Sequence, residues 1–127
     1  MYNTIVQQYI AKLTSEPVRQ LLLNVDSVAG SGKTFTLLKA CARVQELALR
    51  AGKDNPVFRA APTGVAAFNF VGCTLYSLLR LPVRNQAADV SKATLQALQA
   101  RFRPCRFLII DEKSMVNLKT LYRWILA

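Results

Sequence analysis

The sequence predicts an α/β fold, a parallel sheet covered by helices on both faces in a three-layer sandwich. Two observations lead to this prediction. Short apolar runs alternate with longer segments of helical periodicity, and a Gly-rich turn follows the first of these runs. Because strands that alternate with helices favour parallel pairing, we expect at least three parallel strands. The 127 residues, of which 52% are hydrophobic, suffice for one domain with its own core.

The first half of the chain is predicted to contain two helices and one strand. Ile5, Tyr9 and Leu13 recur at helical spacing, and the following Glu-Pro pair ends this helix. Residues 21–25 are an apolar run that predicts a buried strand. A second helix is predicted over 34–51. It has an apolar stripe of Leu37, Cys41, Val44 and Ala48, a polar stripe of Lys39, Arg43, Glu46 and Arg50, and Gly52 as its C-terminal cap.

The second half is predicted to contain two more strands, over 57–61 and 107–110. A Pro-Thr-Gly turn follows the first of them, Gly72 breaks the chain again, and Pro104 stops the helix before the second. The helical segments are predicted over 65–68, 75–79, 91–101 and 119–126, and residues 82–88 are predicted as a loop.

Composition excludes several classes of protein. Histidine is absent, which removes Ser-His-Asp catalysis and most zinc sites. Cys41, Cys73 and Cys105 are far apart and odd in number, which predicts reduced thiols inside a cell. No apolar run approaches the roughly 18 residues of a membrane span, so we expect no membrane segment. The formal net charge of +10 favours a polyanionic partner over a basic surface that is only solvated.

The Gly-rich turn has the composition of a phosphate-binding loop. It reads Ala29-Gly30-Ser31-Gly32-Lys33-Thr34 and opens the predicted second helix. Glycines allow close approach of the backbone to a phosphate, and the helix directs its first N–H groups at it. Lys33 would reach the β- and γ-phosphates, and the Thr34 hydroxyl would bind Mg²⁺. The alternative, a chance Gly-Lys-Thr turn, is disfavoured by the predicted strand before it and the long helix after it.

An acidic pair, Asp111-Glu112, follows the predicted strand 107–110. Ligands of open parallel sheets bind at the carboxyl ends of the strands. There one carboxylate can hold Mg²⁺ and the other can deprotonate an attacking water. An exposed helix N-terminus with favourable charge is the alternative. Together with the Gly-rich turn, the pair predicts a P-loop ATPase that binds ATP and Mg²⁺.

Two turns carry small hydroxyl residues near predicted helix N-termini. Thr63-Gly64 follows the strand 57–61, and Thr74 precedes Ser77 by three residues. Hydroxyl and backbone N–H groups in this arrangement suit the phosphates of single-stranded DNA. Ordinary turn residues are the other interpretation, and the nearby Arg80 and Arg84 are compatible with both.

These segments together resemble the first half of a Pif-type (petite integration frequency) DNA helicase. The specific ones are Thr63-Gly64-Val65-Ala66-Ala67 and Asp111-Glu112-Lys113-Ser114-Met115, which are joined by the Gly-rich turn and by Gly72-x-Thr74-x-x-Ser77-Leu78. The resemblance implies a RecA-like lobe of a P-loop NTPase. It further implies an ATP-dependent, superfamily-one, 5′-to-3′ DNA helicase in DNA repair, recombination and telomere maintenance, located in the nucleus, with the mitochondrion as the alternative.

The resemblance also implies roles for individual residues. Lys33 and Thr34 would bind triphosphate and Mg²⁺, Asp111 would hold Mg²⁺, and Glu112 would be the catalytic base. Gln8, with Gln7 as the alternative, would read adenine. The contacts implied with single-stranded DNA come from Thr63, Gly64, Thr74, Tyr76 and Ser77.

The chain departs from the family pattern at three residues and in its extent. Ser27 replaces a glycine of the phosphate-binding loop, Tyr76 stands where the family usually has histidine, and Lys113 stands where an apolar residue is common. The strand with a Gly-Asp-x-x-Gln segment and the second RecA-like lobe with its arginine finger are absent from the 127 residues. We therefore expect an N-terminal piece of a larger helicase. The alternatives are a P-loop ATPase without nucleic-acid function and a non-catalytic DNA-binding remnant.

Overall fold

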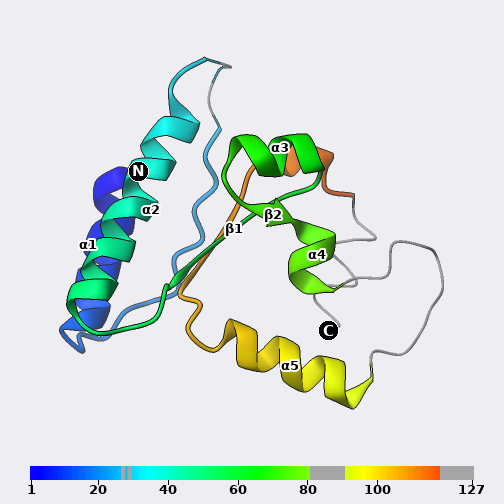
Figure 1. The fold of residues 1–127 in the computed structure, drawn as a ribbon. Helices are drawn as coiled ribbons and strands as arrows, with labels where there is room; N and C mark the ends of the chain where they lie inside the picture. Colours follow the sequence, from blue (N-terminus) through cyan, green and yellow to red (C-terminus); the bar gives the residue numbers. More distant parts are fainter. Residues whose placement is uncertain (27, 29, 81–90, 118–127) are drawn as a thin grey trace. The chain divides into compact units, whose positions relative to one another are not determined.

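The computed structural model describes residues 1–26, 28, 30–80 and 91–117, which fall into two compact units, Met1–Asn55 and Pro56–Ala127 (Figure 1). The first unit contains helices α1 (Tyr2–Leu13) and α2 (Lys33–Arg50), which pack against each other. Their shared core is apolar, and the predicted stripe of α2 lies in it. The buried residues are Ile5, Val6 and Tyr9 of α1 and Leu37, Ala40, Cys41, Val44 and Ala48 of α2.

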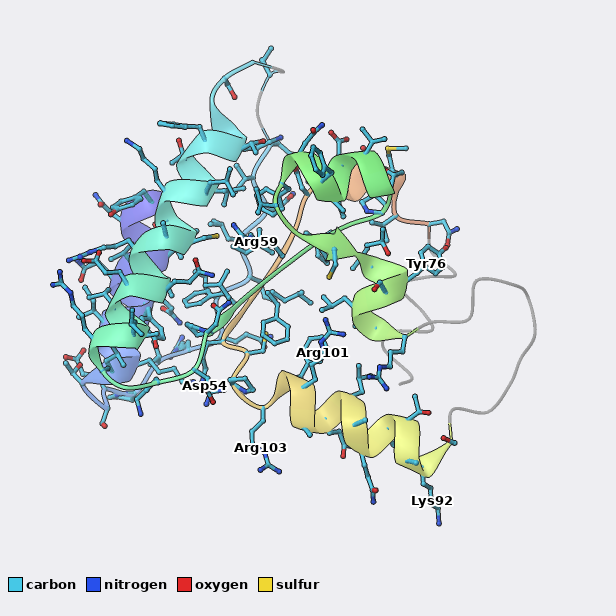
Figure 2. All side chains as sticks on the ribbon, viewed as in Figure 1. Asp54, Arg59, Tyr76, Lys92, Arg101 and Arg103 are labelled. Carbon is cyan, nitrogen blue, oxygen red and sulfur yellow. The ribbon has the colours of Figure 1, made fainter. Side chains whose placement is uncertain are left out.

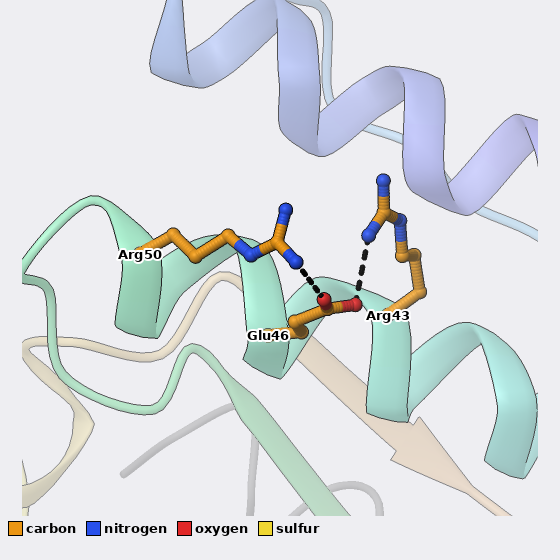
Figure 3. A network of polar contacts seen from close by, with 3 residues as sticks. All are labelled: Arg43, Glu46 and Arg50. Carbon is orange, nitrogen blue, oxygen red and sulfur yellow. Dashed lines mark hydrogen bonds and ion pairs between the residues drawn. The ribbon is translucent and has the colours of Figure 1, made fainter.

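The ends and the outer face of α2 follow from its sequence. Gly52 has a φ of +65°, its N–H donates to the Leu49 carbonyl, and the Lys53 N–H donates to the Ala48 carbonyl. This left-handed C-terminal motif satisfies carbonyls that the helix ladder leaves unpaired, as predicted for Gly52. On the polar face, Glu46 accepts contacts from Arg43 at 2.7 Å and from Arg50 at 2.6 Å (Figure 3).

The predicted strand over 21–25 is wrong. The segment has no regular secondary structure, and Leu22 and Leu23 are 84% and 46% exposed. An apolar run predicts a strand only where another strand offers it hydrogen bonds. Among the described residues of the first unit, the regular elements are both helices, so this run has no strand to pair with there.

The second unit is built on a three-stranded parallel sheet of order β2-β1-β3, so the predicted α/β class with a parallel sheet is confirmed. Ala60 of β1 pairs with both Cys73 and Ile110, which makes β1 the central strand. The strand β2 replaces the failed 21–25 prediction as the third strand. The elements of the unit are β1 (Val57–Ala61), α3 (Gly64–Asn69), β2 (Cys73–Thr74), α4 (Leu75–Leu79), α5 (Lys92–Phe102), β3 (Phe107–Ile110) and the 3₁₀ helix η1 (Lys113–Met115).

The core of the second unit lies between β1 and α4. Ala60 is buried there against three leucines, Leu75, Leu78 and Leu79. Phe102 at the end of α5 joins this core, and its ring lies 5.1 Å from that of Phe58. The predicted helices over 65–68, 75–79 and 91–101 are therefore confirmed to within one residue at each end. The predicted loop 82–88 and helix 119–126 lie outside the described residues.

Candidate nucleotide and nucleic-acid site

The phosphate-binding turn leads directly into α2. Gly30 and Gly32 have φ values of +80° and +76°, a region that L side chains rarely adopt, and Gly32 is the N-cap of α2. A Cβ built on either glycine would meet no atom within 4 Å, so the backbone of the turn is open to a ligand. Ser31 is exposed, and its N–H donates to the Val28 carbonyl at 3.2 Å. Ser27 and Ala29 lie outside the described residues.

The N-terminus of α2 differs from those of α3, α4 and α5. In these three helices the N-cap hydroxyls of Thr63, Thr74 and Ser91 accept a hydrogen bond from a backbone N–H three residues later. The N-cap of α2 is a glycine and makes no side-chain cap. Its helix ladder begins with the Thr36 N–H, which donates to the Gly32 carbonyl at 3.0 Å. The N–H groups of the first turn of α2 therefore have no acceptor within the helix, and they form the positive end of its dipole.

The first two residues of α2 carry the side chains that are predicted to bind phosphate and metal. Lys33 and Thr34 are both half-buried. They lie at the helix N-terminus behind the two glycines, as the sequence predicts, so a cation, a hydroxyl and backbone donors come from one short segment.

The acidic pair directly follows β3 in the second unit. The Asp111 N–H donates to the Ala60 carbonyl of β1 at 3.0 Å, and the Asp111 Oδ1 accepts from the Glu112 N–H at 2.9 Å. Glu112 has a φ of +51°, unusual for a residue with a side chain, and it is exposed where Asp111 is half-buried. The turn thus orients the two carboxylates differently although they are adjacent.

Parallel pairing brings the acidic pair and the two threonine turns to the same edge of the sheet. The strands β1, β2 and β3 end at Ala61, Thr74 and Ile110, and the register aligns these ends. Thr63 follows β1 by two residues, and Asp111 follows β3 directly. With neighbouring strands about 4.8 Å apart, Thr74 and Asp111 flank the central strand at roughly 10 Å from each other.

The threonine hydroxyls cap their own helices. Thr63 Oγ1 accepts from the Ala66 N–H, and Thr74 Oγ1 accepts from the Ser77 N–H, each at 3.2 Å. This geometry gives both residues a structural role, while each hydroxyl keeps its own proton to donate. Gly64 and Ser77 are exposed, and Tyr76 is half-buried on α4 (Figure 2).

The comparison with protein families decides what these two units represent. The model of the AAA domain matches residues 11–127, nearly the whole chain. The chain belongs to the AAA domain family. It is therefore an ATPase-type domain, and its family implies ATP binding.

The similar proteins include a subunit of the RecBCD enzyme and an ATP-dependent DNA helicase. The RecBCD enzyme subunit RecD of two Mycobacterium tuberculosis strains is 34% identical over 109 residues, a match that covers 74% of this chain and 19% of RecD. The ATP-dependent DNA helicase Pif1 of a Psychrobacter strain is 34% identical over 96 residues, 73% of this chain and 14% of that protein. The chain thus spans less than a fifth of these relatives. No solved structure matches it significantly.

The residues at the start of α2 fit the ATP that the AAA domain implies. The fit lies in the two glycines with room beside them, the uncapped helix N-terminus and the adjacent lysine. No described helix is both long and apolar enough to cross a membrane. Thr34 and Asp111, the predicted ligands of Mg²⁺, belong to different units.

Gln8, the predicted adenine reader, already has a hydrogen bond. Its side-chain Nε2 donates to the Arg19 carbonyl at 2.6 Å and so ties α1 to the segment before the phosphate-binding turn. Gln7, the alternative, is exposed. Neither residue acquires a described contact with the turn itself.

Gly72, which the sequence predicts as a chain breaker and as the start of a family segment, also has a role in building the sheet edge. A Cβ on Gly72 would lie 2.6 Å from the Arg59 carbonyl oxygen of β1. Only glycine allows β2 to approach the central strand here. Nothing in the sequence near Gly72 signals this, because the close contact comes from a residue thirteen positions upstream.

Burial affects one cysteine close to the sheet. It raises the pKa of Cys105, whose Sγ donates to the Phe107 carbonyl at 3.6 Å. Burial thus makes this thiol, two residues before β3, less acidic than a free cysteine.

Proposed function

We propose that this AAA domain is the nucleotide-binding lobe of a superfamily-one DNA helicase that couples ATP hydrolysis to 5′-to-3′ movement on single-stranded DNA. The observation that carries the proposal is the shared sheet edge, where Asp111-Glu112 and the two threonine turns lie together. A motor needs hydrolytic and DNA-binding groups on connected elements. The similarity to RecD and Pif1 supports DNA as the polymer.

In this proposal the hydrolytic residues divide between the two units. Lys33 and the first N–H groups of α2 bind the β- and γ-phosphates. Thr34 and Asp111 would hold Mg²⁺, which would neutralise charge on the phosphate oxygens. Glu112 accepts a proton from water as the water oxygen bonds to the γ-phosphorus. The bond from the γ-phosphorus to the β–γ bridging oxygen breaks and releases ADP and phosphate.

The proposed DNA contacts come from the second unit. The Thr63 and Thr74 hydroxyls, which accept capping bonds, donate their protons to phosphate oxygens, and Gly64 leaves room for the backbone of the strand. Ser77 adds a third hydroxyl on the exposed side of α4, and Tyr76 offers a ring for base stacking. The wider role that we propose is DNA repair, recombination and telomere maintenance.

The test is ATP hydrolysis by the 127-residue chain with Mg²⁺, with and without single-stranded DNA. We expect slow hydrolysis that DNA stimulates, and loss of both in Lys33→Ala but not in Lys12→Ala, a control that removes an exposed lysine of α1. Hydrolysis that DNA leaves unchanged would indicate an ATPase without nucleic-acid function. DNA binding without any hydrolysis would indicate a non-catalytic remnant.

A further inference from the structure

An aromatic side chain lies exposed at the start of α2, where the mechanism above does not use it. Phe35 is the third residue of the helix and is 63% exposed. It precedes the buried Leu37 by two residues, a rotation of about 200° around the helix, so it lies on the face opposite the core. Burial against α1 therefore does not explain a phenylalanine at this position.

Phe35 is held by a cation from the same helix. The Lys39 ammonium lies over the Phe35 ring, 4.7 Å from its centroid, within the range of a cation–π contact. Helical side chains lean toward the helix N-terminus, so Lys39 reaches back over the ring and the ring leans toward the phosphate-binding turn. One face of the ring is thus occupied, and the ring lies on the same side of α2 as Gly32, which precedes it by three residues in the phosphate-binding turn.

We propose that Phe35 is a stacking platform for the base of the bound nucleotide, with Lys39 fixing the ring. The inference rests on the proposed nucleotide binding and extends it from the phosphates to the base. Phosphates bound at the N-terminus of α2 leave the nucleoside to lie along the adjacent helix surface, where Phe35 presents its π-face. Every purine has a complementary face, so the platform favours ATP and GTP alike.

If the base stacks on Phe35, loss of the ring should weaken the binding of the whole nucleotide but not the binding of its phosphates alone. Removing an aromatic platform weakens base binding by about tenfold. Phe35→Leu keeps an apolar side chain with good helix propensity and removes only the ring. The matched control is Phe68→Leu, which removes an 83% exposed phenylalanine from the second unit.

The experiment measures the affinities of MgATP, MgGTP and inorganic tripolyphosphate for the full chain by calorimetry, with far-UV circular dichroism to verify folding. For Phe35→Leu we expect about tenfold weaker ATP and GTP binding and less than a twofold change for tripolyphosphate. Phe68→Leu should match the wild type with all three. In Phe35→Trp, ATP should quench the fluorescence of the new indole and tripolyphosphate should not.

Each other outcome overturns a specific statement. Unchanged ATP affinity in Phe35→Leu would overturn the platform and leave the phosphate site intact. Equal losses for ATP and tripolyphosphate would show that Phe35 only supports the turn. Failure of the folded wild type to bind any of the three probes would overturn the proposed nucleotide site as well.

Discussion

Two adjacent residues at the end of α3 occupy positions that each favour glycine, for different reasons. Val71 occupies the left-handed position with a φ of +52°, where glycine is usual, and Gly72 occupies the next position, where a Cβ would strike the Arg59 carbonyl. The Val71 N–H donates to the Phe68 carbonyl and the Gly72 N–H donates to the Ala67 carbonyl, so these two hydrogen bonds close the C-terminus of α3. The glycine serves the sheet rather than the helix.

Gly72→Ala should destabilise the second unit by about 2 kcal/mol, because a Cβ at 2.6 Å from a backbone oxygen forces β2 away from β1. The matched control is Gly64→Ala, where a Cβ meets nothing within 4 Å and alanine favours the helix. Urea denaturation followed by circular dichroism measures both variants. Equal stabilities for the two alanine variants would contradict the close approach.

Val71→Asn should stabilise the chain by about 1 kcal/mol. A β-branched residue at positive φ stores strain, which asparagine tolerates better, and the 65% exposed valine loses little buried area. Val65→Asn makes the same exchange at a 75% exposed position inside α3 and should give no gain. A thermal melt in which Val71→Asn unfolds earlier than wild type would show that the valine contributes a contact worth more than the strain.

At the scale of the element, α2 combines a buried apolar stripe with an exposed charged triad. The Arg43 hydrogen bond, then the charges of Arg50 and Arg43, lower the pKa of Glu46, which lies between them (Figure 3). The same contact raises the pKa of Arg43. A carboxyl whose pKa is lower in the folded than in the unfolded chain stabilises the fold when it is ionised.

The stabilisation by Glu46 should therefore be present above its unfolded pKa of about 4.3 and disappear as pH falls through the lower folded value. Glu46→Gln should be less stable than wild type at neutral pH, and the difference should vanish in acid. Glu16→Gln is the control, because Glu16 contacts Thr14 rather than an arginine. Thermal melts across this pH range provide the measurement. A difference between Glu46→Gln and wild type that is constant with pH would contradict the triad.

Helices could be predicted from this sequence because their signal is local. A strand depends on a partner strand elsewhere in the chain, which the local sequence does not show. The stripe of Leu37, Cys41 and Val44 determines α2 by itself, because a helix forms its hydrogen bonds internally. The failed strand over 21–25 and the unpredicted β2 show the converse. A two-residue strand has no periodicity to detect, and Cys73–Thr74 exists only because Gly72 lets the chain approach Arg59.

At the scale of the whole molecule, positive charge predominates, with 17 lysines and arginines against 7 acidic residues and a net charge of +10. On α2, Glu46 alone is the acidic partner of both Arg43 and Arg50. A polyanion that binds such a surface releases counterions. The charge alone could be predicted from composition, whereas the shared edge of the threonine turns and Asp111 required the strand order.

Single-stranded DNA should therefore bind with a steep salt dependence. Neutralising three phosphates gives a slope of roughly −2 for log affinity against log salt concentration. Fluorescence anisotropy over a salt series measures it, and a peptide nucleic acid of the same sequence, which lacks phosphates, is the control. Affinity that does not change with salt would show that the charge only solvates the protein.

The 127-residue chain, tested as a polypeptide by itself, should not unwind DNA. Unwinding requires two lobes that close around ATP, so that hydrolysis changes their grip on the strand in alternation. Fast hydrolysis also requires a cationic finger at the γ-phosphate, which contributes a factor of about 10³–10⁵ in rate. Arg101 is poorly placed for this role, because the last turn of α5 leads into the amino end of β3, and Asp111 follows its carboxyl end.

Figure 2 shows Arg101 and Arg103 leaving α5 in different directions, so this helix offers no joint cationic site. Arg123, the other arginine on a predicted helix, lies outside the described residues. The measurement is strand release from a forked duplex with ATP and Mg²⁺. Efficient release by a monomer would contradict the need for a second lobe. Release only at high protein concentration would mean that two copies assemble, one lending the other the surface that closes over the nucleotide.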